Sequence, residues 1–203
     1  MGQGDYDESA GQRYGLHCRM GGRKVRNAVC FFFALLSSSL LSGDTGAVRA
    51  LREAPRSRAV YETEIAAPIA RVWNAFTTNE GLQAWMAPKV EIDLAVGGAM
   101  RSSYDLDGEL GDSSTIVNTI LSYDPERMLS LQATQFPTGS PLAEAAQGTW
   151  SIFYFQELET ERTRITVVGL GFNESEASQQ IRQFFATANA RLLEGLKQAL
   201  ASD

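Results

Sequence analysis

The feature that most constrains the fold is the last long segment, residues 176–200, in which apolar residues recur at steps of three and four. This spacing places them on one side of an α-helix, with polar side chains on most of the other side. A helix of this length spans roughly 35 Å, enough to cross a small sheet. The apolar stripe comprises Ile181, Phe184, Phe185, Ala188, Leu192, Leu196, Ala199 and Leu200, and the polar side comprises Arg182, Gln183, Asn189, Arg191, Glu194 and Lys197.

The start of this helix carries two candidate caps. Asn173 and Ser175 can each accept a hydrogen bond from a free N–H group of the first turn. Glu176 lies three residues after Asn173, a variant of the capping box. The adjacent phenylalanines 184 and 185 need a wide apolar surface to cover them, and upstream strands would supply it.

The segments before this helix alternate mostly with the period of strands. We expect a first strand over residues 60–65, then short helices beginning at Pro68 and near Glu80 and ending near residues 76 and 85. Six further strands are predicted over residues 90–94, 100–104, 115–123, 128–133, 149–158 and 163–170. Antiparallel strands followed by a separate helix are typical of an α+β layer arrangement.

One of these strands carries apolar side chains on both faces. Trp150, Ile152 and Tyr154 alternate with Phe153 and Phe155, so each set faces its own side of the sheet. A strand that is apolar on both faces is expected in the interior of a sheet.

Residues 1–50 are expected to be an N-terminal extension and a signal peptide. Arg23, Lys24 and Arg26 precede an apolar run over residues 28–41, which is shorter than the ~20 apolar residues of a membrane span and is followed by small residues. Cleavage is expected near residues 45–50, with Met1 or Met20 as the start. Residues 51–59 would be a linker and 60–203 the mature domain, periplasmic or secreted. The alternatives are an uncleaved membrane anchor and a buried helix of a cytoplasmic protein.

The expected cleavage limits the chemistry of the remaining domain. His17, Cys18 and Cys30 all lie in the leader, so the rest of the chain has no histidine and no cysteine. Disulfides, thiolate nucleophiles, histidine bases and most zinc sites are thereby excluded. From Leu51 onward there are 12 basic and 20 acidic residues, a formal net charge of −8, which disfavours nucleic acid and anionic membrane surfaces as partners.

Several short motifs occur in an order that resembles a known family. They are Ile65-Ala66-Ala67-Pro68, Val72-Trp73, Phe76-Thr77, Leu82, Trp85, Gly97-Gly98, Asp107-Gly108 and Asp124-Pro125-Glu126-Arg127. In order and spacing they resemble the domain of homologues of the heat-shock protein 90 ATPase activator, within the START-like, polyketide-cyclase-like superfamily. The resemblance covers about residues 60–200. The segment after Arg127 departs from the family pattern, because it lacks the tryptophan often found there.

This resemblance implies a helix-grip fold, in which a curved antiparallel sheet of six to seven strands wraps a long C-terminal helix around an internal cavity. Members bind lipids, hormones or aromatic polyketides, some catalyse cyclisation, and some contact a chaperone. The fold alone therefore does not fix the function.

Large aromatic and sulfur-containing side chains are the candidate walls of such a cavity, although for each one alone filling the core is the more common role. The predicted ligand-binding residues are Trp85, Met100, Tyr104, Trp150, Phe153, Phe172, Phe184 and Phe185.

The acidic segment 105–112 does not match a calcium-binding loop. Counted as an EF-hand from Asp105, it places Leu110 at the glycine position and Ile116 at the bidentate glutamate position. Glu91 and Asp93 lie two apart on a strand and are interpreted as a solvent-facing pair. We expect no metal site, no cofactor and no assigned catalytic residue.

Three functions follow from these observations. The first is an exported module that binds a small apolar or aromatic molecule between sheet and helix. The second is a cyclase- or hydratase-type enzyme that uses Tyr104, Glu109 or Asp112 inside the cavity. The third is a protein-binding module similar to the chaperone activators.

Overall fold

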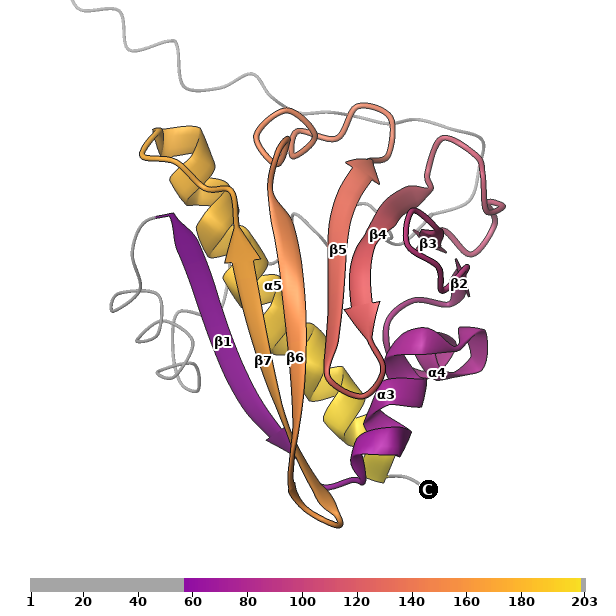
Figure 1. The fold of residues 1–203 in the computed structure, drawn as a ribbon. Helices are drawn as coiled ribbons and strands as arrows, with labels where there is room; N and C mark the ends of the chain where they lie inside the picture. Colours follow the sequence, from indigo (N-terminus) through magenta and orange to yellow (C-terminus); the bar gives the residue numbers. More distant parts are fainter. Residues whose placement is uncertain (1–56, 202–203) are drawn as a thin grey trace, which may run out of the picture.

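The computed structural model describes residues 57–201, which form a seven-stranded antiparallel sheet and three helices (Figure 1). The predicted signal peptide, and the linker up to residue 56, lie outside the described residues. The elements in chain order are β1 (Arg58–Ile65), α3 (Ile69–Thr77), α4 (Asn79–Trp85), β2 (Lys89–Ile92), β3 (Ala99–Ser103), β4 (Ile116–Asp124), β5 (Met128–Gln135), β6 (Trp150–Glu159), β7 (Arg162–Leu170) and α5 (Glu176–Ala201).

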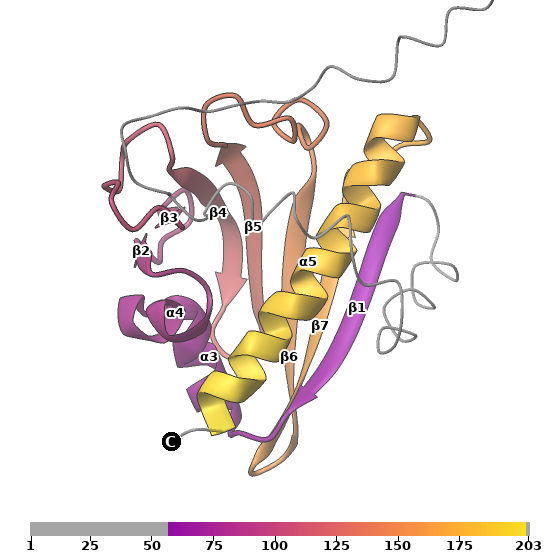
Figure 2. The same cartoon turned by 180° about the vertical axis from the view of Figure 1, so that it is seen from behind.

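The strands are arranged in the order β1-β7-β6-β5-β4-β3-β2, and the sheet curves around α5. Figure 2 shows α5 running diagonally over one face of the sheet, toward the end where α3 and α4 lie. This arrangement confirms the α+β helix-grip fold. Strand β6 lies between β7 and β5, so the prediction of an interior strand is also confirmed.

Most element boundaries differ from the sequence prediction by one or two residues, and two of these differences bear on the fold. Strand β1 begins at Arg58, two residues before the predicted start. Strand β2 ends at Ile92 because the next residues form a turn, in which the N–H of Ala95 donates to the carbonyl of Asp93 at 2.8 Å. Gly97 has a φ of +83° in this turn, a conformation that a residue with a Cβ adopts at a cost.

The buried side of α5 is rotated from the predicted stripe. Phe184 and Leu192 are only half-buried, whereas Arg182, predicted on the polar side, is 9% exposed. Its Nε donates to the carbonyl oxygen of Arg58 at 2.8 Å, and this bond satisfies a charge that would be costly to bury alone. Asn189 was also predicted on the polar side, but its side chain is half-buried.

The N-terminus of α5 is capped by Ser175. Its Oγ accepts a hydrogen bond from the N–H of Ser178 at 3.2 Å. The Asn173 side chain instead accepts from the N–H of Ser175 at 2.9 Å, so it orients the residue that provides the cap. The structure therefore selects Ser175 from the two predicted candidates.

The main core lies between the inner face of the sheet and the three helices. Phe76 on α3 is its aromatic centre, with ring centroids 4.9 Å from Trp85, 5.4 Å from Phe153 and 5.1 Å from Phe155. The largest fully buried apolar side chains are Ile65, Val72, Leu82, Val90, Ile120, Leu129, Ile165, Val167, Leu193 and Leu196. A smaller cluster comprises Ala59, Ala146, Phe172 and Ile181, against which Phe136, Leu142, Ala145 and Phe185 pack.

The packing of α5 can be tested by truncating Leu196, which is fully buried. Leu196→Ala is expected to lower the free energy of unfolding by about 2–5 kcal/mol, because it removes buried apolar surface and leaves a cavity. The control is Leu106→Ala, which truncates a leucine that is 72% exposed and is expected to change stability by less than about 0.5 kcal/mol. Urea denaturation measures both, and equal effects would contradict the assigned packing.

Candidate functional site

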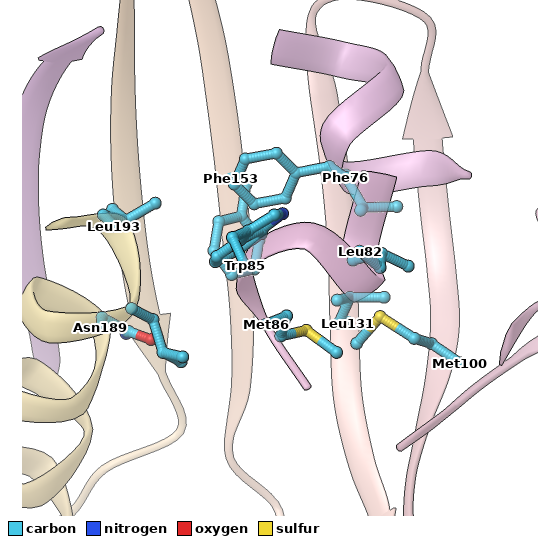
Figure 3. A pocket seen from close by; sticks show the side chains of 11 residues that line it. Phe76, Leu82, Trp85, Met86, Met100, Leu131, Phe153, Asn189 and Leu193 are labelled. Carbon is cyan, nitrogen blue, oxygen red and sulfur yellow. The ribbon is translucent and has the colours of Figure 1, made fainter. Parts of the chain in front are cut away.

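A small cavity of about 50 Å³ lies between α5, α4 and the inner face of the sheet (Figure 3). Ten of its lining residues are apolar and one, Asn189, is polar. The complete lining is Phe76, Leu82, Trp85, Met86, Met100, Leu129, Leu131, Phe153, Asn189, Leu192 and Leu193.

The strands position their share of this lining through alternation and register. Leu129 on β5 pairs with Phe153 on β6, so both side chains face the helix side of the sheet. Leu131 lies two residues further along β5 and therefore shares that face. Met100 contributes from β3, and it is buried in the same core cluster.

Helix α4 contributes an aromatic wall whose polar atom is already bonded. The Trp85 Nε1 donates to the carbonyl oxygen of Ala75 at 2.9 Å. Its ring also packs on Phe76, with centroids 4.9 Å apart. The indole is thus fixed by the fold and leaves its apolar surface for the cavity.

The cavity is small by the standard of ligand sites. Pockets for drug-sized ligands enclose roughly 300–1,000 Å³, whereas a single water needs only about 10–15 Å³. Two methionines, Met86 and Met100, line this cavity. Methionine is unbranched and has three rotatable bonds, so these two are the most adaptable side chains of the lining.

The predicted ligand-binding residues fall into separate groups. Trp85, Met100 and Phe153 lie together around the cavity. Phe172 and Phe185 belong to the smaller cluster near the start of α5. Phe184 packs edge-on against Phe185, with ring centroids 5.6 Å apart.

The other two predicted residues lie elsewhere. Trp150 shares the outer face of β6 with Ile152 and Tyr154, opposite to the face that Phe153 presents to the cavity. Tyr104 follows the end of β3, and burial raises the pKa of its phenol, so the group stays neutral at physiological pH. It does not line the cavity.

Most of the missed lining residues are aliphatic. The predicted short helix ending at residue 85 contains Leu82, and the predicted strand over residues 128–133 contains Leu129 and Leu131 on one face. The prediction favoured aromatic and sulfur-containing side chains, so it left out the leucines; Phe76 and Met86 are of the favoured kind and were missed as well. Asn189 was not predicted to line the cavity, because the sequence pattern placed it on the polar side of α5.

The polar groups of the acidic loop between β3 and β4 bind the loop itself. The Asp112 carboxylate accepts from the N–H of Glu109 at 2.9 Å, and from the N–H and Oγ of Ser114 at 2.7 and 2.6 Å. The Lys89 ammonium donates to the carbonyls of Leu106, at 2.8 Å, and Gly108. Within residues 57–201, no group of three or more histidine, cysteine, aspartate or glutamate residues is placed to hold a metal ion.

The loop bonds set the titration of Asp112. The Ser114 hydroxyl, followed by the N–H groups of Glu109 and Ser114, lowers the pKa of the Asp112 carboxyl below its usual range. A lowered pKa in the folded state stabilises the protein above the unfolded pKa of about 4, and this contribution is lost as the pH falls through the folded value.

Asp112→Asn is therefore expected to lower the urea midpoint modestly at pH 7, and the difference from wild type should shrink in acid. The control is Asp107→Asn, which removes another carboxylate of the same loop. It should cause a smaller difference at pH 7, because within residues 57–201 the Asp107 carboxylate accepts no hydrogen bond and only its N–H is bonded, to Asp105. Urea titrations at a series of pH values measure this. A difference that is constant with pH would contradict the role of the Asp112 bonds.

No helix among the described residues combines the length and the apolar character that crossing a membrane requires.

Comparison with known proteins identifies the family. The family model described as "Activator of Hsp90 ATPase homolog 1-like protein" matches residues 66–201. A search of curated proteins found no match.

Three solved structures illustrate the similarity of fold. A protein from Mesorhizobium loti is 20% identical, covers 71% of this chain and 97% of its own, and has a TM-score of 0.57. The Aha1 dimer from Colwellia psychrerythraea is 19% identical over 70% of this chain and 95% of its own, with a TM-score of 0.54. A protein from Arthrobacter aurescens is 18% identical over 73% of this chain and 88% of its own, with a TM-score of 0.55.

These identities support the fold alone, whereas the family match extends from residue 66, just before α3, to the end of α5. The chain belongs to the family of Activator of Hsp90 ATPase homolog 1-like proteins.

Proposed function

We propose that this protein is a binding module for a small apolar or aromatic molecule, held between α5 and the inner face of the sheet. The observation that carries this proposal is the cavity itself, with ten apolar side chains among its eleven lining residues. Burial of apolar surface stabilises a bound ligand by about 25 cal/mol per Å². The family fold is compatible with binding a ligand or a protein, and the cavity favours the ligand.

The lining also favours binding over catalysis. None of the described residues that line the cavity is ionisable, so none of them can act as an acid or a base on a molecule held there. Glu109 and Asp112 lie in the loop between β3 and β4, where the Asp112 carboxylate is engaged by loop donors. Acid–base catalysis requires such a group within hydrogen-bond reach of the substrate.

The volume of the cavity indicates the size of the ligand. An apolar cavity of about 150 Å³ holds one benzene ring. The cavity here is about a third of that, so a single ring requires Met86 and Met100 to move aside. We therefore infer a compact ligand, no larger than one substituted ring.

Toluene is a suitable probe for this site. Wild-type protein is expected to bind it in the millimolar range or tighter, and Leu192→Trp is expected to weaken binding at least about tenfold by filling the half-buried edge of the cavity. The matched control, Leu106→Trp, adds the same side chain at an exposed loop position. Methyl chemical shifts of Leu193 and Met100 report binding. Failure of wild type to bind, or equal binding by Leu192→Trp, would overturn the proposal.

We also propose that the domain acts outside the cytoplasm. The support is the sequence pattern alone, in which a basic stretch, an apolar run and small residues precede the domain. Mass spectrometry of the protein from the extracytoplasmic fraction of its source is expected to find an N-terminus near residues 45–51. An intact N-terminus in the cytoplasmic fraction would contradict export.

A further inference from the structure

The two edges of the sheet differ in how far the rest of the fold covers them. Strand β2 forms one edge, and α4 occupies it with side-chain hydrogen bonds. The Gln83 Nε2 donates to the carbonyl oxygen of Val90 at 3.3 Å, and the N–H of Ile92 donates to Asn79 Oδ1 at 2.9 Å. These bonds oppose the addition of a further strand at β2.

Strand β1 forms the other edge (Figure 2). An antiparallel edge strand bonds its neighbour through alternate residues, so its remaining N–H and C=O groups point away from the sheet. The carbonyl oxygen of Arg58 accepts from Arg182. Among residues 57–201, however, the backbone of residues 60–64 has no hydrogen-bond partner other than β7. This edge therefore offers backbone hydrogen bonds to a strand of another chain.

The side chains of β1 that face away from the core have a charge order that is complementary to itself. Residues 58, 60, 62 and 64 share this face, and they are arginine, valine, glutamate and glutamate. The preceding alternate residue, Arg56, lies outside the described residues, but in the sequence it extends the pattern to Arg-Arg-Val-Glu-Glu. Two antiparallel copies aligned at Val60 place Arg58 of each copy opposite Glu62 of the other.

Both members of this pair can take a partner from another chain. Within residues 57–201, no acidic side chain forms an ion pair with Arg58. The Glu62 side chain is 53% exposed, and its Oε1 lies 3.5 Å from the Nε of Arg164. Its Oε2 accepts from the hydroxyl of Thr166 at 3.1 Å. Because a carboxylate has about four acceptor sites, Glu62 can accept further hydrogen bonds.

We propose that β1 is a dimerisation surface, on which β1 of a second copy of this chain pairs antiparallel about a two-fold axis at Val60. A two-fold axis makes every contact occur twice, so the dimer has two ion pairs between Arg58 and Glu62. Oppositely charged residues that face each other across two strands stabilise their pairing. The backbone bonds between the copies also remove the open edge of each sheet.

The axis at Val60 is favoured over the neighbouring registers. It extends an apolar row on the outer face, because Val60 pairs with Val168 of β7, and Val168 pairs with Ile152 of β6. An axis at Tyr61 would place Val60 opposite the charged Glu62. An axis at Glu62 would place this residue opposite its own copy, and like charges directly opposite each other are destabilising.

Charge reversal followed by rescue tests this dimer. Arg58→Glu makes both ion pairs repulsive, and Glu62→Arg does the same. The double variant Arg58→Glu/Glu62→Arg restores two attractive pairs with their charges exchanged. The matched control is Arg191→Glu, the same change at an exposed position of α5. Each protein is expressed from the full-length gene, and sedimentation equilibrium measures the Kd of its dimer.

Each single reversal is expected to raise this Kd about tenfold, whereas the double variant should lie within about threefold of wild type and Arg191→Glu should not differ from it. Amide hydrogen exchange in β1 should slow as the concentration of wild type rises. Wild type that stays monomeric up to about 1 mM would overturn the proposal and leave the edge to a strand of another protein. A dimer that the single reversals do not weaken, or that the double variant does not restore, would overturn the pairing about Val60.

Discussion

The structure depends on the burial of one side of α5 against the concave face of the sheet. Leu193 and Leu196 are fully buried and belong to the same core cluster as Ile165 and Val167 of β7. A 26-residue helix is secured mainly by such packing, because helix propensity alone stabilises an isolated helix only marginally. At its start, the bond from Arg182 to the carbonyl of Arg58 ties the same helix to the edge strand β1. The helix is thereby held near its start by this hydrogen bond and in its later turns by the buried leucines.

The cavity exists because a straight helix and a curved sheet do not meet everywhere. Figure 2 shows α5 crossing the strands diagonally, so its later turns approach α3 and α4. Phe76 and Trp85 occupy much of the space at that end, and their rings are held by mutual packing and by the bond from Trp85 to Ala75. What they leave open is bounded by rigid aromatic rings on one side and by flexible methionines on another. Packed rings hold their positions, whereas methionine side chains adapt to their neighbours.

The order of elements could be predicted from the sequence because the strands and helices have different periods. Alternation in residues 149–158 also identified β6 as an interior strand, since Ile152 and Phe153 are both apolar and face opposite sides. The orientation of α5 was harder to predict. Apolar residues such as Phe184 and Leu192 are only half-buried, so the apolar stripe is wider than the buried side of the helix and does not define its direction. Arg182 and Asn189 were consequently assigned to solvent. Arg182 instead donates a hydrogen bond to the carbonyl of Arg58, and Asn189 is one of the residues that line the cavity.

Because the orientation of α5 was not known from the sequence, the aromatic residues that line the cavity could not be distinguished from those that lie elsewhere. Trp150 and Phe153 lie three residues apart on one strand, yet only Phe153 faces α5, because three is an odd number of steps in a pattern of period two. Alternation divides the strand residues into two faces, but the choice of the inner face comes from the position of α5. Once that face is known, the lining follows from register, and the one polar residue within it becomes visible. Because the lining is apolar except for Asn189, burial of apolar surface is the main interaction that it offers to a molecule held there.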